Sequence, residues 1–150
     1  IEVGGFDNLT YSPNGRAQKM LTRLAIENLF HPFQTFILGQ KQMALKLALK
    51  FGVDLVFYGE NEAEYGNPIA DNVKSLRDKS FHTYDNIDEV YLGGVSTKEL
   101  IDQYGLTRNE LLPYLPAEQS EFEKSDVQVH YMGYYLQWVT QEAYYYAVEN

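Results

Sequence analysis

The order helix, glycine, buried strand restricts most strongly how this chain can fold. Residues 36–51 have the spacing of an amphipathic helix, and Gly52 is a typical stop after it. The next residues, 54–58, form a short apolar run of the kind found in buried parallel strands. The stripe of this helix that is expected to be buried is Ala44, Leu47, Ala48 and Phe51. The stripe that is expected to face solvent is Gln42, Lys46 and Lys50. This order is half of a βαβ unit and predicts an α/β fold with a parallel sheet.

Capping signals predict further helices. Ser12 as N-cap and Pro13 at the first helical position indicate a helix over residues 13–29, which ends before Pro32. Its apolar stripe is Ala17, Met20, Leu21, Leu24, Ala25 and Leu29. The first helix and the helix over 36–51 are both expected to pack on the parallel sheet.

The second half of the chain is predicted to hold a small helical insert, a strand and a last helix. The capping boxes "STKE" and "TRNE" open helices at residues 98–104 and 108–112, and a third is expected from 116 to 124. The insert therefore covers about residues 97–124. The alternating run "VQVHYM" predicts a second parallel strand over residues 127–131, and Thr140 begins a helix.

Composition excludes several classes. The net charge is -9, from 12 Lys and Arg against 21 Asp and Glu, so binding to nucleic acid is not expected. No apolar run approaches the roughly 20 residues of a membrane span, and no signal peptide is visible. The chain has no cysteine, which excludes disulfides and thiolate metal sites within it and is compatible with a cytoplasmic location.

The acidic stretch "GENEAEYGN", which begins at Gly59, directly follows the predicted strand 54–58. Ligands of open parallel sheets bind beyond the carboxyl ends of the strands. Glutamates at such a place could hold Mg²⁺, orient ammonia or bind hydroxyl groups. A solvated acidic loop explains the same residues, and spacing alone leaves the two interpretations even.

Two further motifs have structural interpretations. "LGGVST" resembles a phosphate loop, but Leu92 stands where a hydroxyl is needed and no lysine follows, which favours a turn into a capped helix. The rings of "HYMGYY" are expected to divide between the core and a surface for a sugar or a base. The three histidines, His31, His82 and His130, are not spaced as metal ligands.

Several long motifs, in one order over nearly the whole chain, resemble one family: "GGFDNLTYSPNG", "NLFHPFQTFILGQK", "LVFYGENEAEYGN", "YLGGVSTKEL" and "VHYMGYYLQWVTQEAYYYAVEN". They are similar to the N-acetyl sugar amidotransferases of surface-polysaccharide biosynthesis, in the PP-loop ATP pyrophosphatase superfamily. The resemblance implies that residues 1–150 are the central and C-terminal part of one PP-loop ATPase domain, with a Rossmann-like (adenine nucleotide alpha hydrolase-like) parallel sheet.

The resemblance also implies a reaction. ATP activates the acetamido oxygen of a nucleotide-linked sugar by adenylation, and ammonia displaces it to give an acetamidino group. Ammonia comes from a glutaminase partner through a synthase-like subunit, and the products enter lipopolysaccharide O-antigen or related glycans. The implied cofactors are ATP and Mg²⁺, and the implied location is cytoplasmic.

Site residues follow from the resemblance in three groups, with no metal ligand assigned. The catalytic group is Glu60, Asn61 and Glu64. The ATP-binding group is Gly59, Glu60, Asn61 and Glu62. The substrate-binding group is Asn8, Gln40, Lys41, Tyr134, Tyr135 and Glu142.

The chain departs from the family at three points. The Ser-Gly-Gly-x-Asp-Ser loop and a cysteine-bearing segment are not in it and are expected upstream of Ile1, and Thr140 stands where members often have proline. The chain alone is therefore expected to hold half a site and to be inactive. A glycoside hydrolase, which needs a carboxylate pair from separate elements, and a non-catalytic sugar-binding or subunit-docking module are the alternatives.

Overall fold

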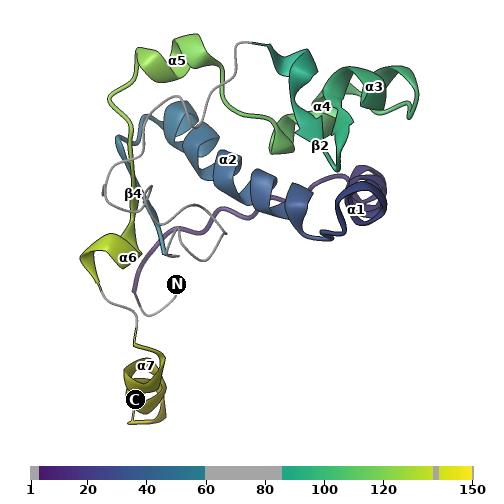
Figure 1. Cartoon of the computed structure of the whole chain (residues 1–150). Coiled ribbons are helices and arrows are strands. Elements are labelled where there is room, and N and C mark those ends of the chain that lie inside the picture. Colours follow the sequence, from purple (N-terminus) through teal and green to yellow (C-terminus); the bar gives the residue numbers. More distant parts are fainter. Residues whose placement is uncertain (1–3, 60–85, 137–138, 150) are drawn as a thin grey trace. The chain divides into compact units, whose positions relative to one another are not determined.

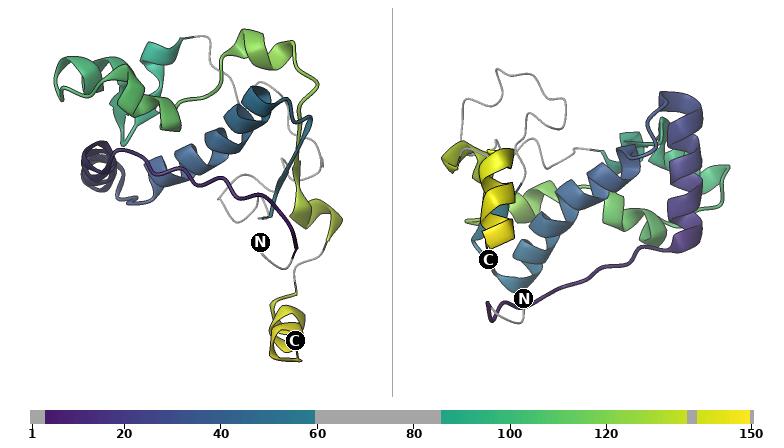
Figure 2. Two further views of the ribbon diagram at one scale, coloured as in Figure 1. Left: turned by 180° about the vertical axis from the view of Figure 1, so that it is seen from behind. Right: turned by 90° about the horizontal axis from the view of Figure 1, so that it is seen from below.

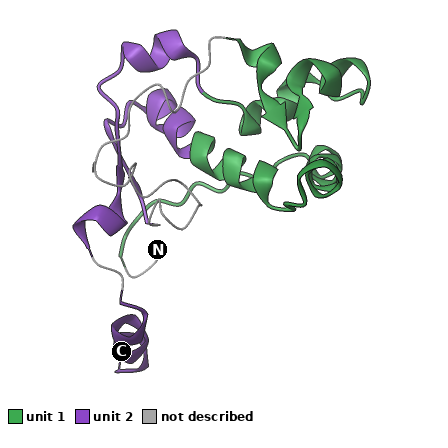
Figure 3. Cartoon of the chain, in the orientation of Figure 1, with its two compact units in different colours: residues 1–43, 85–116 green, residues 44–84, 117–150 purple. Residues whose placement is uncertain are grey.

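The computed structural model describes residues 4–59, 86–136 and 139–149 of the chain. The chain forms two compact units (Figure 3), the first made of residues 1–43 and 85–116 and the second of residues 44–84 and 117–150. Each unit has a hydrophobic core of its own. The architecture is mixed α/β, as the sequence predicts. No helix among these described residues is both long and apolar enough to span a bilayer.

The first unit is mainly helical (Figure 1). Its elements are α1 (Gly15–Leu29), the first part of α2 (Gln34–Phe51), the 3-10 turn η4 (Ile87–Glu89), the two-residue strands β2 (Tyr91–Leu92) and β3 (Val95–Ser96), α3 (Thr97–Asp102), α4 (Arg108–Leu111) and the 3-10 turn η5 (Leu112–Tyr114). The capped helices α3 and α4 confirm the two helix starts predicted after residues 96 and 107.

Helix α1 starts later than predicted. Its N-cap is Asn14, whose Oδ1 accepts hydrogen bonds from the N–H groups of Arg16 (2.9 Å) and Ala17 (3.2 Å). The prediction of Ser12 as cap is therefore wrong: the carboxamide of Asn14 reaches two free N–H groups, and Pro13 lies outside the helix. The helix ends at Leu29, as predicted.

Helix α1 buries its apolar stripe in the core of the first unit. Ala17, Leu21, Leu24 and Ala25 are buried, Met20 is partly buried and Leu29 is exposed. The residues that share this core come from β2, β3, α3, α4, η5 and the loops next to them, and Leu38 of α2 packs against it. The prediction that α1 packs on the parallel sheet is thus not met, because its buried stripe belongs to a different core.

The motif "LGGVST" is a hairpin that leads into a capped helix. β2 and β3 pair antiparallel, and their two-residue loop, Gly93 and Gly94, has φ values of 62° and 79°. Positive φ at both positions is the signature of a type I′ turn. Gly93 donates its N–H to Gln34 Oε1 and accepts from Asn28 Nδ2, each at 2.9 Å. The predicted turn is confirmed, and both polar groups of Gly93 are used within the protein.

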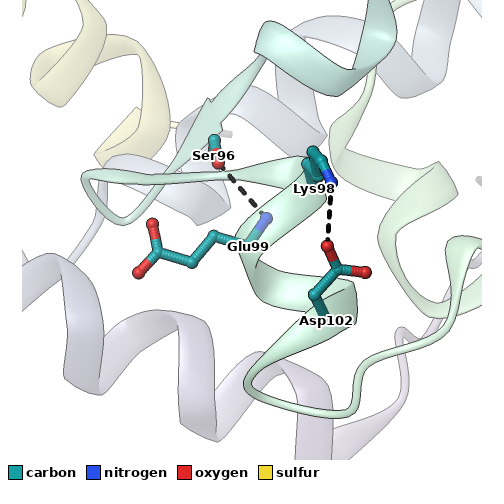
Figure 4. A network of polar contacts seen from close by, with 4 residues as sticks. All are labelled: Ser96, Lys98, Glu99 and Asp102. Carbon is teal, nitrogen blue, oxygen red and sulfur yellow. Dashed lines mark hydrogen bonds and ion pairs between the residues drawn. The ribbon is translucent and has the colours of Figure 1, made fainter.

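Helix α3 is held by a cap and by one ion pair (Figure 4). Ser96 Oγ accepts from the N–H of Glu99 at 3.2 Å, and Lys98 Nζ lies 3.0 Å from Asp102 Oδ2. The hydrogen bond and the charge of Asp102 raise the pKa of Lys98. Both contacts are local, and the ion pair is solvent-exposed, so they support the helix itself.

The second unit contains the parallel sheet. Its elements are the rest of α2, β1 (Leu55–Tyr58), α5 (Gln119–Glu123), β4 (Gln128–Tyr131), α6 (Met132–Tyr135) and α7 (Thr140–Glu149). β1 and β4 lie side by side (Figures 1 and 2) and pair in parallel, with Leu55 opposite Gln128 and Tyr58 opposite Tyr131. Both predicted strands and their parallel pairing are confirmed.

Helix α2 buries only part of the predicted stripe, namely Ala48 and, partly, Ala44. Its buried residues are Thr35, Gln42, Leu45 and Ala48, while Phe51 is 56% exposed. The observed stripe is rotated by about one residue, or 100°, from the predicted stripe. The cause is tertiary: Leu38 packs against the core of the first unit, and Leu45 belongs to the core of the second.

Candidate functional site

The carboxyl ends of β1 and β4 meet at one edge of the sheet. Because the strands are parallel and Tyr58 pairs with Tyr131, the chain leaves both strands on the same side. Gly59 follows β1 there, and α6 begins at Met132 directly after β4. The start of the acidic stretch and the tyrosines of α6 therefore belong to the same edge, where ligands of parallel sheets bind.

Most of the acidic stretch itself lies outside the described residues. Glu60, Asn61, Glu62 and Glu64 belong to residues 60–85, so their catalytic and ATP-binding roles stay predictions. Gly59 is described: it is exposed, and a Cβ at this position would meet no atom within 4 Å. There is therefore room for a side chain at this position.

The two faces of the parallel sheet differ in chemistry. On the inner face, Tyr58, Val129 and Tyr131 are buried and Val56 is partly buried, in a core with Leu45 and Ala48 of α2. The outer face carries the alternate residues Leu55, Phe57, Gln128 and His130. Among these, Leu55 is 50% and Phe57 46% exposed. The outer face is thus half open and mixes apolar with polar planar groups.

Three rings form a closed triangle on the outer face. The centroids of Phe57 and His130 are 5.5 Å apart, those of Phe57 and Tyr135 6.0 Å, and those of His130 and Tyr135 5.8 Å. Tyr134 joins through an edge-to-face contact with Tyr135 at 5.3 Å. These spacings are in the range of favourable aromatic pairs. We call Phe57, His130, Tyr134 and Tyr135 the ring cluster.

Hydrogen bonds fix the orientation of the rings. The hydroxyl of Tyr135 lies 2.6 Å from His130 Nδ1, and Gln128 Oε1 lies 3.3 Å from His130 Nε2. A carboxamide oxygen can only accept, so in this arrangement Nε2 carries a proton. In neutral imidazole Nδ1 then accepts the proton of the Tyr135 hydroxyl. The oxygen of Tyr135 keeps lone pairs that can accept a hydrogen bond from a ligand.

The chemistry of the ring cluster suits an uncharged ligand. The cluster and Gln128 contain no Lys or Arg, which are the residues that bind phosphate most strongly. Exposed ring faces bind apolar surfaces, and the hydroxyls and the carboxamide bind N–H and O–H groups. Among residues 4–59, 86–136 and 139–149, no group of three or more His, Asp or Glu could hold a metal ion.

The other predicted substrate residues are spread over both units. Asn8 is exposed in the segment before α1, Gln40 is exposed and Lys41 half-buried in α2, all in the first unit. Glu142 is exposed in α7 of the second unit. Of the six predicted substrate residues, the structure brings Tyr134 and Tyr135 into ring contact.

Sequence reasoning missed Phe57, Gln128 and His130 as members of the site. Alternation in the run 127–131 does place Gln128 and His130 on one face, and that signal was present in the sequence. Their closeness to Phe57 depends on the register of β1 against β4, in which Phe57 lies opposite His130. A register between strands about seventy residues apart has no local sequence signature.

Among the described lysines of the second unit, Lys46 has the most strongly shifted pKa. Burial lowers the pKa of its ammonium group to about 8. The residue is half-buried, which differs from its predicted place on the solvent-exposed stripe of the helix. The side chain stands on α2, the helix that covers the inner face of the sheet.

A scan against protein-family models finds no match to the chain, and a search of curated proteins finds none that is significantly similar.

Proposed function

We propose that the chain is part of an ATP-dependent N-acetyl sugar amidotransferase, which converts the acetamido group of a nucleotide-linked sugar to an acetamidino group. The observation that supports the proposal is that β1 and β4 end at the same edge of the parallel sheet. The acidic stretch begins at Gly59, after β1, and the ring cluster lies beside the end of β4. An activated-amide reaction needs both kinds of surface, one for charged cofactors and one for a neutral sugar.

ATP and Mg²⁺ fit the donor chemistry of the acidic stretch. Carboxylate and carboxamide oxygens are the protein ligands that Mg²⁺ prefers, and Glu60, Asn61, Glu62 and Glu64 supply them. ATP would supply the AMP group that makes the amide oxygen a good leaving group. The carboxylates would also keep ammonia or ammonium close to the reacting carbon. The proposal includes a larger Rossmann-like PP-loop sheet, of which β1 and β4 are two neighbouring strands.

Partners and place follow from the same chemistry. Ammonia is scarce and volatile as a free reagent, so a glutaminase with a synthase-like subunit would deliver it. A nucleotide-linked sugar for lipopolysaccharide O-antigen, or a related glycan, would be the acceptor. Both ATP and such sugars are found in the cytoplasm, where we place the reaction.

The decisive experiment replaces carboxylates by amides in the full-length protein. With saturating ATP, ammonium and a nucleotide-linked N-acetyl sugar, Glu60→Gln and Glu64→Gln should lose on the order of 10²-fold or more in turnover, as for removal of one preorganised electrostatic group. Mass spectrometry of the acetamidino product measures the rate. Glu121→Gln, at an exposed position of α5, is the matched control and should keep full activity.

Equal rates in the wild type and both variants would show that the acidic stretch is a solvated loop without a catalytic role. An ATP-independent release of sugar would favour a glycoside hydrolase instead. Isothermal calorimetry on the 150-residue chain should show ATP binding that is weak or absent, because its sequence has no Ser-Gly-Gly-x-Asp-Ser loop. Micromolar affinity would contradict this expectation.

A non-catalytic sugar-binding module is the second candidate, and the ring cluster favours it. In that case the full-length protein would bind N-acetyl sugars without consuming ATP. ATP turnover coupled to product formation separates the two candidates.

A further inference from the structure

The outer face of the parallel sheet does not have the composition of a face that packs under a helix. Buried faces of parallel sheets are nearly continuous in Val, Ile and Leu. Here β4 presents Gln128 and His130, and the rings beside them are about half exposed. A face of rings with a few fixed polar groups is typical of a small-molecule site.

We propose that the ring cluster binds the acetamido group of the N-acetyl sugar, and that His130 is the positioning residue which holds Tyr135 for this contact. The inference deepens the proposed function and rests on it for the class of sugar. It adds Phe57, Gln128 and His130 to the tyrosines predicted from the sequence.

Three properties of an acetamido group match the ring cluster. Its methyl group is apolar and packs against ring faces such as that of Phe57, which is 46% exposed. Its amide N–H needs an acceptor, and the Tyr135 oxygen retains lone pairs after donating to His130 Nδ1 at 2.6 Å. The acetamido group is uncharged, and the cluster has no Lys, Arg, Asp or Glu that would require an ionic partner.

The role of His130 follows from its two hydrogen bonds. Gln128 Oε1 fixes the proton on Nε2, so that Nδ1 is left as an acceptor for the Tyr135 hydroxyl. Without that acceptor the phenol would be free to turn its proton toward the ligand, where an acceptor is required. The imidazole thus determines which face of the Tyr135 hydroxyl the sugar meets.

Saturation-transfer NMR and shift titration on the 150-residue chain test the site directly. The probe is free N-acetylglucosamine, with glucose and glucosamine as comparison sugars. We expect the acetyl methyl protons to receive the strongest saturation, with a Kd roughly in the millimolar range that suits so small a contact. Glucose should bind at least about threefold more weakly, in line with the loss of one modest hydrogen bond.

Variants separate the contacts. Tyr135→Phe removes one hydroxyl and should weaken N-acetylglucosamine roughly 3- to 10-fold, while Tyr91→Phe, at an exposed tyrosine of the first unit, should change nothing. His130→Ala should weaken binding to the same degree as Tyr135→Phe. His130→Asn places an acceptor oxygen near the position of Nδ1 and should restore most of the affinity. Thermal unfolding of each variant, followed by circular dichroism, shows that the fold is kept.

Four results would overturn the inference. These are no saturation of the acetyl methyl in the wild type, equal affinity in Tyr135→Phe, no difference between His130→Asn and His130→Ala, or stronger binding of glucosamine, which would indicate a cation–π site. A dimer of the chain that Phe57→Asp dissociates would also overturn it, because the outer face would then be an interface between copies.

Kinetics of the full-length enzyme can show whether the inferred sugar site or the proposed function is wrong. In the full-length enzyme, His130→Ala should raise the KM for the sugar and leave kcat nearly unchanged. If the acetamidino product forms and this KM does not move, the function stands and the site is wrong. If the chain binds N-acetyl sugars at the ring cluster but the full-length protein never consumes ATP, the site stands and the function is wrong.

Discussion

Gly93 is a residue whose backbone approaches a neighbouring helix closely. A Cβ at this position would lie 2.9 Å from the carbonyl oxygen of Leu21 and 3.0 Å from the N–H nitrogen of Ala25. Since both atoms belong to the backbone of α1, neither can move aside like a side chain. We expect Gly93→Ala to lower the free energy of unfolding by roughly 2 kcal/mol or more, from positive φ together with overpacking.

The matched control for Gly93→Ala is Gly105→Ala. Gly105 has a similar φ of 65°, but a Cβ placed on it would meet no atom within 4 Å. Gly105→Ala should lower the free energy of unfolding only by the cost of positive φ for alanine, about 1–2 kcal/mol. Urea denaturation measures both values, and equal losses would show that α1 does not contact the turn.

Among the described residues other than glycine, Phe30 has a positive φ, 53°. The residue is 91% exposed. It ends α1, and its N–H donates to the carbonyl of Ile26 at 3.1 Å. Glycine adopts this conformation without strain, and little burial is lost with the ring. Phe30→Gly should therefore raise the free energy of unfolding by about 1 kcal/mol. A loss of stability, measured by urea denaturation, would mean that the exposed ring makes a stabilising contact.

At the scale of the element, two substitutions test which residue caps the start of α1, Asn14 or Ser12. Asn14→Ala removes the acceptor of two N–H groups and should cost about 1 kcal/mol of stability. Ser12→Ala, at the cap expected from the sequence, should be neutral within about 0.5 kcal/mol. The reverse order, measured by chemical denaturation, would place the helix start at residue 13.

At the scale of the whole molecule, Tyr114 connects three elements of the first unit. From η5 its hydroxyl donates to Gln18 Oε1 of α1 at 2.5 Å, and a Cβ on Gly39 of α2 would lie 3.3 Å from its ring. Burial raises the pKa of Tyr114 to about 12, and the nearby Tyr11 adds to the shift. An unfolded tyrosine titrates near 10.

Stability should therefore fall as the pH rises from about 10 to about 12. In this window the unfolded state releases the proton of Tyr114 and the folded state keeps it, which favours unfolding by up to about 1.4 kcal/mol per pH unit. Below pH 10 the contribution is fully present. The difference in unfolding free energy between wild type and Tyr114→Phe isolates this residue from the other tyrosines. An unchanged difference across the window would contradict the assignment.

Local patterns in the sequence determined most of the elements. The strands β1 and β4, the capped helices α3 and α4 and the Gly93-Gly94 turn all follow from residues within a few positions of each other. Capping boxes, positive-φ glycines and apolar runs act through the backbone nearby, so no distant partner is needed to recognise them. The parallel pairing followed from the order of helix, glycine and strand.

Tertiary structure alone decided which faces these elements bury and which residues meet. Leu45 and Gln42 are buried in α2 against the predicted pattern, and the residues that share the core with Leu45, such as Phe122 and Val129, are distant in the sequence. Phe57 meets His130 and Tyr135 because of an inter-strand register that no neighbouring residue encodes. The physical reason is range: capping and turn formation depend on contacts a few residues apart, whereas burial and the ring cluster depend on segments brought together by the whole fold.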